Sequence, residues 1–479
     1  MQNIRIPLVV DLDGTITPID TLIESIVSIL KRNPLEIIRL LYWLVSTRGI
    51  ADFKHRVAAK GRFAVPQVPF REDFIAWLHS EKQSGRTIIL ATAAHESIAR
   101  TVAERVGIFD AVLFSTQSVN LKGPAKLAAI QERFGGNFSY AGDSQADLPI
   151  WQAAKASVLV GASVRLSAEV ARHGNIEKCF TYPVASLSTW LRAMRIHQWV
   201  KNILMFIPLL TAFAFTSGVQ LQNAAIGFIA FSLAASSTYI LNDIWDLDSD
   251  RSHPRKRMRP FAAGLIPADR GVAMSVLLTA AALLLALVIS LDFVGMVVIY
   301  IILTTTYSLV LKRYVLIDVL VLALLYTFRV LAGAVAIDVT VTQWLLAFSV
   351  FIFFSLALVK RCAELVSLRN SNKEAMKGRD YQVADLAVLW SLGTGAGLCS
   401  VVVFGLYVGS PEAINLYGGT TNGLWMAGIG LVYWISRIWL KTGRGEMHDD
   451  PIVFSLKDFG SQVAISAMVV ITLSMHFIG

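Results

Sequence analysis

Apolar positions divide this chain into two halves of different character. Up to about residue 190, short apolar segments alternate with charged ones, which predicts a soluble α/β domain. Most of the later apolar stretches approach the roughly 20 residues that a helix needs to cross a bilayer core. They predict nine spanning helices near 203–217, 224–241, 271–290, 293–310, 315–337, 342–359, 388–408, 423–440 and 462–478.

Lys and Arg residues gather in alternate loops between these stretches. Eighteen of them lie in the loops 242–270, 311–314, 360–387 and 436–461, and the loops between these four hold none. Because Lys and Arg accumulate on the cytoplasmic side of a cell (inner) membrane, we expect a cytoplasmic N-terminal domain and a C-terminus on the outer side. The expected boundaries are 1–180 for that domain, 181–200 for an interfacial linker and 201–479 for the membrane domain.

Composition narrows the class of protein further. Of 479 residues, 55% are apolar and 16% are charged, which excludes a disordered chain. The net charge of +9 does not indicate a nucleic-acid partner, because most of the relevant basic residues sit in short loops between apolar stretches. The three cysteines are too scattered for a disulfide framework or a zinc site.

The first predicted strand, Ile6 to Val10, ends in two carboxylates, Asp11 and Asp13. On a tight turn, the first can attack phosphorus, and the second can protonate the leaving oxygen and later activate water. A second predicted strand, 87–91, ends at Thr92, whose hydroxyl can hold a phosphoryl oxygen.

Two further motifs complete this set. Lys126 opens a helix and can neutralise a phosphate, although Lys122 is an alternative that the sequence does not decide between. A third predicted strand, 138–141, leads to Asp143 and Asp147, two acids well placed for Mg²⁺.

These four motifs, in this order, resemble the haloacid dehalogenase (HAD) superfamily of phosphatases over roughly residues 5–175. The resemblance implies a Rossmann-like parallel sheet, a nucleophile at Asp11, an acid/base at Asp13, and Mg²⁺ held by these two with Asp143 and Asp147. It also implies a mainly helical cap over about 16–85. The alternative to an active phosphatase is an inactive scaffold domain. We expect the apolar cap segments 22–30 and 35–45 to form the cap core, with contact to the membrane or the second domain as the alternative.

The second predicted span runs into Asn242, Asp243, Asp246 and Asp250. In a helix, residues spaced i, i+4 and i+8 share one face. Acids beside a membrane surface repel one another unless a cation lies between them, and Mg²⁺ commonly binds carboxylates together with substrate phosphates. The cluster therefore predicts a metal–diphosphate site; a solvated acidic loop is the alternative.

The motif NDxxDxxxD with nine predicted spans resembles the UbiA superfamily of intramembrane prenyltransferases over about 190–479. The resemblance implies an all-α membrane bundle whose cavity holds a polyprenyl chain, with the phosphate near the aspartates and Mg²⁺. The second DxxxD motif of the aromatic prenyltransferases is missing from the expected place. The segments RxxQWVKN (Arg195 to Asn202) and YSxxLKR (Tyr307 to Arg313) look like the polyprenyl-phosphate (decaprenyl-phosphate) phosphoribosyltransferase branch instead.

That branch uses 5-phosphoribosyl diphosphate as donor and polyprenyl phosphate as acceptor. The candidate substrate-binding residues are Lys201, Asn202, Arg255, Lys256, Arg259, Tyr307, Lys312, Arg329, Lys360, Arg361 and Glu364. Asp318 and Arg329 lie within a predicted span, where charges are usually paired or functional. We expect either a second acidic patch or simply a helix cap from three later acids, Asp449, Asp450 and Asp458.

The favoured function is Mg²⁺-dependent phosphoribosyl transfer to polyprenyl phosphate in the bilayer, with the phosphatase domain removing the 5-phosphate of the product. An aromatic (4-hydroxybenzoate-type) prenyltransferase is the runner-up. A lipid transporter or flippase with a regulatory phosphatase domain is the alternative of another class.

Overall fold

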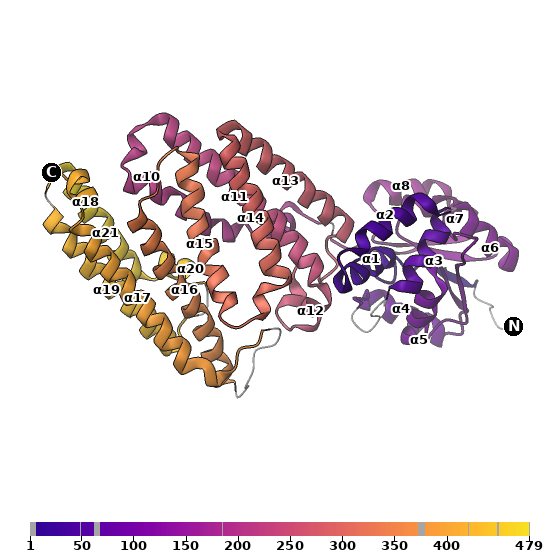
Figure 1. The fold of residues 1–479 in the computed structure, drawn as a ribbon. Coiled ribbons are helices and arrows are strands. Elements are labelled where there is room, and N and C mark those ends of the chain that lie inside the picture. The colour runs from indigo at the N-terminus through magenta and orange to yellow at the C-terminus, as the bar shows by residue number, and fades with distance from the viewer. Residues whose placement is uncertain are drawn as a thin grey trace. The chain divides into compact units, whose positions relative to one another are not determined.

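The computed structural model describes residues 6–47, 49–61, 68–183, 185–371, 379–419, 421–447 and 450–478. The chain forms two compact units, Met1–Met194 with Tyr239–Ser275 and Arg195–Thr238 with Val276–Gly479 (Figure 1). The change of unit at residue 194 lies inside the predicted linker. Residues 239–275, which the sequence pattern assigned to the membrane domain, group with the N-terminal part of the chain in this division, and the predicted domain boundaries stay predictions.

A six-stranded parallel sheet is the centre of the first unit, in the order β3-β2-β1-β4-β5-β6. Its strands are β1 (Leu8–Val10), β2 (Ile88–His95), β3 (Ala111–Ser115), β4 (Ser139–Gly142), β5 (Ala156–Val160) and β6 (Ile176–Phe180). The predicted parallel sheet is thereby confirmed. Because the strand order reverses at β1, the carboxyl ends of β1 and β4 border the crevice in which open α/β sheets bind ligands.

Helices cover both faces of this sheet, and alternate residues of β1 point to opposite faces. Leu8 and Val10 pack in one cluster with Phe74 and Leu78 of α4 (Glu72–Gln83) and with residues of α5 (Glu96–Val106). Val9 packs in the other cluster, with residues of α6 (Pro124–Phe134), α7 (Leu148–Ala153) and α8 (Val164–His173). Thus α4 falls within the predicted cap range 16–85 but packs against the sheet as one of its covering helices.

Three helices form a separate small core beside the sheet: α1 (Thr21–Arg32), α2 (Glu36–Ser46) and α3 (Ile50–Lys60). Ile29, Leu40, Phe53 and Val57 are buried in it. The expectation that 22–30 forms cap core is confirmed, since Leu22, Ile26 and Leu30 also pack here. The expectation for 35–45 holds only in part, because α2 buries Leu40 and leaves most of its other apolar residues exposed.

The segment 239–275 joins the first unit through contacts with α1. Both terminal nitrogens of Arg251 bind the Glu24 carboxylate, at 3.0 and 2.7 Å, and Lys31 Nζ lies 2.5 Å from Asp248 Oδ2. Gly264 has a φ of +69°, and a Cβ there would collide with Pro18. The last part of α11 (Gly218–Trp245), all of α12 (Leu247–Ser252) and the start of α13 (Ala268–Ile289) belong to this segment.

Most of the second unit is helical. Across the described ranges, eight helices are long and apolar enough to cross a membrane. They comprise α11, α13, α14 (Leu291–Leu309), α15 (Ile317–Ala336), α16 (Gln343–Asn370), α17 (Leu386–Val408), α19 (Leu424–Gly443) and α21 (Phe459–Ile478). The shorter helix α10 (Ile207–Thr211) precedes α11, and the shorter helices α18 (Pro411–Leu416) and α20 (Pro451–Lys457) lie between later members of this set.

The first predicted span, 203–217, is not one continuous helix, so the prediction of nine spanning helices is not confirmed. A 3-10 helix, Ile196–Phe206, runs into α10, and a second short 3-10 helix covers Ala214–Thr216. The left-handed conformation of Phe213 (φ 50°) separates the last two pieces. Gly333 of α15 lets this segment approach closely, because a Cβ at that position would overlap the Met205 backbone.

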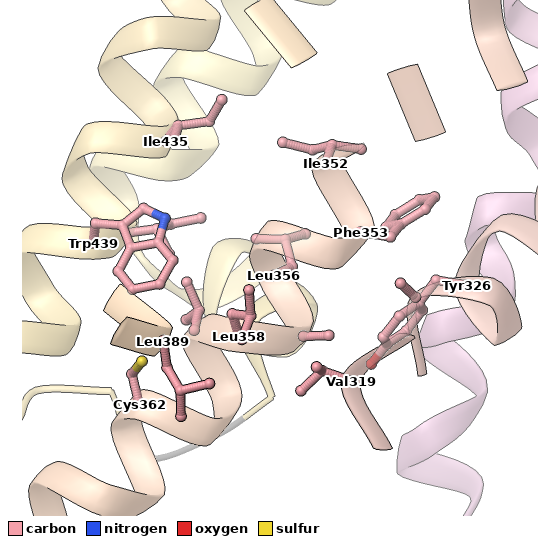
Figure 2. Close-up of a cluster of buried hydrophobic side chains, with 14 of the residues drawn as sticks. Val319, Tyr326, Ile352, Phe353, Leu356, Leu358, Cys362, Leu389, Ile435 and Trp439 are labelled. Atoms are coloured by element: carbon pink, nitrogen blue, oxygen red, sulfur yellow. The ribbon is translucent and has the colours of Figure 1, made fainter. Parts of the chain in front are cut away.

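Helices α15, α16, α17 and α19 meet in the largest apolar core of the second unit (Figure 2). Side chains of all four helices interdigitate there, among them Val319, Tyr326, Phe353, Leu356, Leu358, Cys362, Leu389, Ile435 and Trp439. Two polar side chains inside are satisfied internally: Trp439 Nε1 donates to Ser355 Oγ at 3.1 Å, and that hydroxyl donates to the Gly393 carbonyl at 2.7 Å.

Candidate functional site

Asp11 lies directly after β1, and a buried ammonium group holds its carboxylate. Lys126 Nζ is 2.7 Å from Asp11 Oδ2, and the Leu12 N–H donates to Asp11 Oδ1 at 2.8 Å. Lys126 is 2% exposed, whereas Lys122 is exposed and precedes α6. The structure therefore brings Lys126 to the site and leaves Lys122 outside it. One oxygen of Asp11 is aligned by the strand end and the other is bound by a cation.

Asp147 anchors the other side of this site. Tyr140 of β4 donates its hydroxyl hydrogen to Asp147 Oδ1 at 2.8 Å, and Lys126 Nζ lies 3.1 Å from the same hydroxyl oxygen. The Ser144 N–H and hydroxyl donate to Asp147 Oδ2 at 3.2 and 3.1 Å. Asp147 is thus fixed from two directions, and its contacts hold the turn that carries Asp143.

The carboxylate oxygens of Asp11, Asp143 and Asp147 lie within 4.8 Å of one another, and no other such acidic or metal-ligating triad occurs in the described ranges. Burial raises the pKa of Asp11, and burial together with the charge of Asp11 raises the pKa of Asp143 to about 8. A divalent cation between these carboxylates relieves the repulsion between their negative charges. Gly14 leaves the necessary room, since a Cβ there would overlap the Asp143 carboxylate. The donor set therefore fits a hard, oxygen-seeking cation.

Asp13 stands apart from that triad and contacts the cap. The backbone N–H and the hydroxyl of Thr21, the first residue of α1, donate to its two carboxylate oxygens at 3.0 and 3.2 Å. Burial raises the pKa of Asp13 to about 7. A carboxyl group with this pKa can carry a proton near neutral pH, as a general acid must. Its place as a metal ligand, which the sequence suggested, is not evident from this geometry.

A small cavity of about 40 Å³ lies beside Asp13 and is lined by Thr21, Ser25, Lys54 and His95. The Lys54 ammonium donates to the Ala93 carbonyl at 3.0 Å, and burial lowers the pKa of this lysine. Thr92, fully buried on β2, accepts the Ala94 N–H at 3.0 Å. The cavity thus offers a polar pocket next to the expected acid.

Sequence reasoning missed two cations of this site, Lys54 and Arg71. Arg71 donates to the Gly14 carbonyl from Nε at 3.3 Å and from Nη2 at 3.0 Å, and its guanidinium stacks on Tyr182. Both residues come from segments that carry no recognisable motif. Nothing in the linear pattern marks them, because only the packing of α3 and α4 brings them to the end of β1.

The second acidic motif spans the end of α11 and the start of α12 within the first unit. The Asp246 N–H donates to the Asn242 carbonyl and the Asp250 N–H to the Asp246 carbonyl, each at 2.9 Å, so backbone hydrogen bonds link these three positions across the break between the two helices. Asp243 and Asp250 are 2% and 1% exposed. Arg259 joins these two acids, with Nη1 at 3.3 and 2.6 Å from their oxygens.

The guanidinium of Arg259 already pairs with the two buried acids of this motif, Asp243 and Asp250. One further feature suits a cation, because Asn242 Oδ1 is buried without a hydrogen-bond partner. A buried oxygen without a donor is costly unless something electropositive reaches it. Arg255 and Lys256, which we predicted to bind phosphate, are exposed beside a short 3-10 helix, Lys256–Met258.

A buried polar cluster lies in the second unit around Asp450. Its Oδ2 is 2.8 Å from Lys201 Nζ and 3.5 Å from Lys360 Nζ, and it accepts the Tyr326 hydroxyl at 2.8 Å. The two lysines hold the pKa of Asp450 below its usual range, although burial opposes them. Asp450 also caps α20, because its Oδ1 accepts the Ile452 N–H at 3.2 Å. Asp450 therefore fits the interpretation as a helix cap, while its place in a second acidic patch stays a prediction and Asp449 falls outside the described residues.

Arg329 of α15 is buried and bound by polar groups. Its Nε donates to Asn202 Oδ1 at 2.9 Å, Nη2 donates to the Tyr300 hydroxyl at 3.0 Å, and Nη1 donates to the Leu325 carbonyl. Asn202 in turn donates to Ser232 Oγ at 2.9 Å. The motif residues of the 3-10 helix Ile196–Phe206 are thus tied to α15 and α11 in the interior of the second unit.

Arg361 of α16 is fully buried and bound to acids on both sides. Its Nε lies 2.5 Å from Asp318 Oδ2 and its Nη1 lies 2.6 Å from Glu364 Oε2. Tyr307 donates to Asp318 at 2.7 Å, and Arg379 reaches Glu364 at 3.2 Å. Lys312 is half-buried in the 3-10 helix Leu311–Arg313. We infer a structural role for this cluster, because its contacts, apart from the Arg361–Glu364 pair within α16, join different segments of the unit.

Replacing Arg361 with methionine should therefore destabilise the protein strongly. Breaking a buried ion pair leaves an uncompensated charge and costs about 3–5 kcal/mol. The measurement is the fraction that stays folded in detergent across a temperature series. The matched control is Arg437→Met, whose partner Asp458 is held at 2.7 Å on a partly exposed surface and for which we expect about 1 kcal/mol or less. Unchanged stability of Arg361→Met would contradict the structural role.

Comparison with known proteins adds to this geometry. Residues 204–456 match the profile of the UbiA prenyltransferase family. The uncharacterized protein y4nM of Sinorhizobium fredii is 37% identical over 95% of this chain and 88% of its own length, so that alignment reaches both units. The nodulation protein NoeC of Azorhizobium caulinodans is 34% identical over 58% of this chain and 90% of its own length. A decaprenyl-phosphate phosphoribosyltransferase of Mycolicibacterium smegmatis is 31% identical, over 49% and 74%.

Proposed function

Because this chain belongs to the UbiA prenyltransferase family and is a multi-pass membrane protein, we propose that it transfers phosphoribose from 5-phosphoribosyl diphosphate to a polyprenyl phosphate. In this reaction the bond between the ribose C1 and the diphosphate breaks, and a bond forms between that carbon and an oxygen of the lipid phosphate. Diphosphate leaves. The homology to a decaprenyl-phosphate phosphoribosyltransferase over 74% of that enzyme's length supports this choice within the family.

The observation that carries the proposal is the pair of lysines that share one buried carboxylate. Lys201 and Lys360 both contact Asp450, and the ammonium of Lys360 lies farther from it, at 3.5 Å. Two cations with one anion leave a positive charge in a place where charge is expensive. A phosphate group compensates this charge and accepts hydrogen bonds from both lysines.

The acidic motif at the end of α11 is the second phosphate-type site. We assign Asn242, Asp243, Asp246 and Asp250 to a Mg²⁺ that binds the donor diphosphate, with Arg259 beside it. When bound, this ion neutralises the departing diphosphate. Arg259 can turn from the acids to a diphosphate oxygen, since its side chain is 28% exposed. Two phosphate-type sites match two phosphorylated substrates, whereas an aromatic prenyltransferase needs one.

The N-terminal unit is proposed to be a HAD-type phosphatase that removes the 5-phosphate of the lipid product. The Asp11 carboxylate attacks phosphorus, the P–O bond to C5 of the ribose breaks, and Asp13 gives its proton to the leaving oxygen. Water then hydrolyses the aspartyl phosphate with Asp13 as base. Lys126 holds the nucleophile. Asp11, Asp143 and Asp147 are the residues that would hold Mg²⁺, which when bound neutralises the phosphoryl oxygens.

Helix α1 supports a link between the two activities. Its first residue, Thr21, binds Asp13, while Glu24 and Lys31 bind Arg251 and Asp248 of the acidic-motif segment. One short helix thus touches the proposed acid of the phosphatase and the segment that carries the proposed diphosphate site. The alignment with y4nM, which covers 95% of the chain, is in keeping with a combined function.

The proposed orientation rests on the distribution of basic residues along the chain. Lys and Arg of the membrane part fall in alternate loops, and such loops face the cytoplasm. We therefore assign the N-terminal unit and both phosphate sites to the cytoplasmic side of the inner membrane, and the C-terminus to the outer side.

The test is an assay of the purified full-length protein in lipid nanodiscs with Mg²⁺. Labelled 5-phosphoribosyl diphosphate with polyprenyl phosphate should give a labelled lipid whose mass equals polyprenyl phosphate plus ribose minus one water, with or without the added 5-phosphate. Prenyl diphosphate with 4-hydroxybenzoate should give no product. The proposal fails if no lipid-linked ribose forms and the prenyl group appears on the aromatic acid instead.

A further inference from the structure

One helix of the cap exposes far more apolar surface than its packing within the domain requires. Helix α2 and the residue before it present Leu35, Ile38, Leu41, Tyr42 and Val45 at 72, 67, 58, 66 and 87% exposure. Ile37 and Leu44 next to them are also exposed. Single exposed apolar side chains are ordinary, but a contiguous group of this size marks an interaction surface.

These side chains form a continuous stripe. Positions 35, 38, 41–42 and 45 follow one another at three- and four-residue steps, the spacing of one helix face. A different face packs inward, where Leu40 is 6% exposed and Trp43 lies against the cap core with Ile29 and Phe53. The fold of the cap therefore uses one side of α2 and leaves the stripe without a partner in the described residues of the domain.

Charge around the stripe is mainly positive. Arg32, Arg39 and Lys60 lie on or beside it, whereas Lys31 is paired with Asp248. Its acidic neighbour Glu36 is bound by Arg39 at 3.1 Å and by Lys60 at 2.8 Å. Apolar residues with tyrosine or tryptophan on one face and basic residues at its border are typical of helices that lie in the headgroup region of a bilayer. Anionic headgroups attract such basic residues.

We propose that α2 is an interfacial membrane helix, with its apolar stripe inserted among the headgroups of anionic lipids. The partner of the apolar stripe is the bilayer surface, because spanning helices anchor the same polypeptide in the membrane. Helix α2 therefore meets lipid at a high effective concentration, at which even a weak interfacial helix stays bound. The stripe and its basic border are complementary to that surface in both apolar character and charge.

The consequence for function rests on the proposed phosphatase activity. The cap carries Thr21 at Asp13 and Lys54 at the cavity. A cap held flat on the bilayer receives phosphate esters that stand in the headgroup layer, attached to lipid, in preference to soluble ones. Membrane docking of α2 therefore assigns a lipid-linked phosphate ester as the substrate class of this site.

The test measures the environment of one side chain in the full-length protein. Val45→Cys is labelled with a nitroxide in a background with Cys179→Ser and Cys399→Ala, which removes the two exposed cysteines. The matched control is Glu132→Cys on the exposed side of α6. Both proteins are placed in vesicles of one part phosphatidylglycerol to three parts phosphatidylethanolamine, and collisions with oxygen and with a water-soluble nickel chelate are compared by electron paramagnetic resonance.

Insertion predicts that oxygen reaches the Val45 label several-fold better, relative to the nickel chelate, than it reaches the Glu132 label, because oxygen concentrates in lipid. Replacing Leu41 with Glu in the Val45→Cys protein should abolish that difference. Free access of the nickel chelate to Val45 would overturn the proposal, since the stripe would then lie in water. Poor access for both reagents would also overturn it, because another part of the chain or a second copy would then cover the stripe.

These outcomes do not depend on catalysis. The same measurement on an Asp11→Asn protein should give the same ratio at Val45, so that failure of the phosphatase proposal and failure of the docking proposal remain distinct. A second readout compares hydrolysis of p-nitrophenyl phosphate with dephosphorylation of the lipid product. Leu41→Glu should lower the second several-fold and leave the first unchanged; equal effects on both would contradict the docking role.

Discussion

Asp11→Asn should give a protein that still makes the phosphoribosyl lipid but accumulates it in the 5-phosphorylated form. The amide cannot attack phosphorus, so the dephosphorylation rate should fall by roughly 10³-fold or more. Transfer should continue, because Asp11 belongs to the sheet site and the proposed transfer sites use other residues. Mass spectrometry of the lipids formed from 5-phosphoribosyl diphosphate distinguishes the two forms by the mass of one phosphate.

The side chain at position 11 faces Lys126 across 2.7 Å, and asparagine retains its size. A loss of phosphatase activity would therefore reflect chemistry. Glu132→Gln, an exposed change on α6, is the control and should leave the product ratio as in the wild type. If Asp11→Asn also gives the wild-type ratio of the two lipids, the N-terminal unit does not act on this product.

Asp246→Asn should abolish most of the transfer activity, by roughly 10²- to 10³-fold, since it removes a charged ligand from the proposed Mg²⁺ site. The residual activity should require more Mg²⁺ than the wild type does, which a titration of the metal measures directly. Chelation with EDTA should stop transfer in both proteins, and added Mg²⁺ should restore it.

The same helix offers the matched control. Asp248 lies two residues away but points to α1, where it binds Lys31 at 2.5 Å and is 42% exposed. Asp248→Asn should leave the rate of transfer and its Mg²⁺ requirement nearly unchanged. Equal losses from Asp246→Asn and Asp248→Asn would indicate a general effect of charge on the segment, and full transfer by Asp246→Asn would remove the metal site from this position.

Several features of this protein follow from its sequence because they depend on local pattern. Eight of the nine predicted apolar stretches form helices of bilayer length in the described ranges, and an apolar strand followed by two acids produces the end of β1. The spacing of Asn242, Asp246 and Asp250 required only that the chain keep its four-residue backbone hydrogen bonds past the end of α11, as it does. The similarity to the prenyltransferase family likewise rested on motifs that are contiguous in the chain.

Other features depend on which distant segments meet, and only the tertiary structure decided them. Lys122 and Lys126 look alike in sequence, and the packing of α6 against the sheet brings one of them to Asp11. The partnership of Asp450 with Lys201 and Lys360 joins residues that lie up to 249 positions apart in the chain. The exposure of α2 could not be predicted from its apolar residues, because hydrophobicity shows that a side chain avoids water and packing alone determines what covers it.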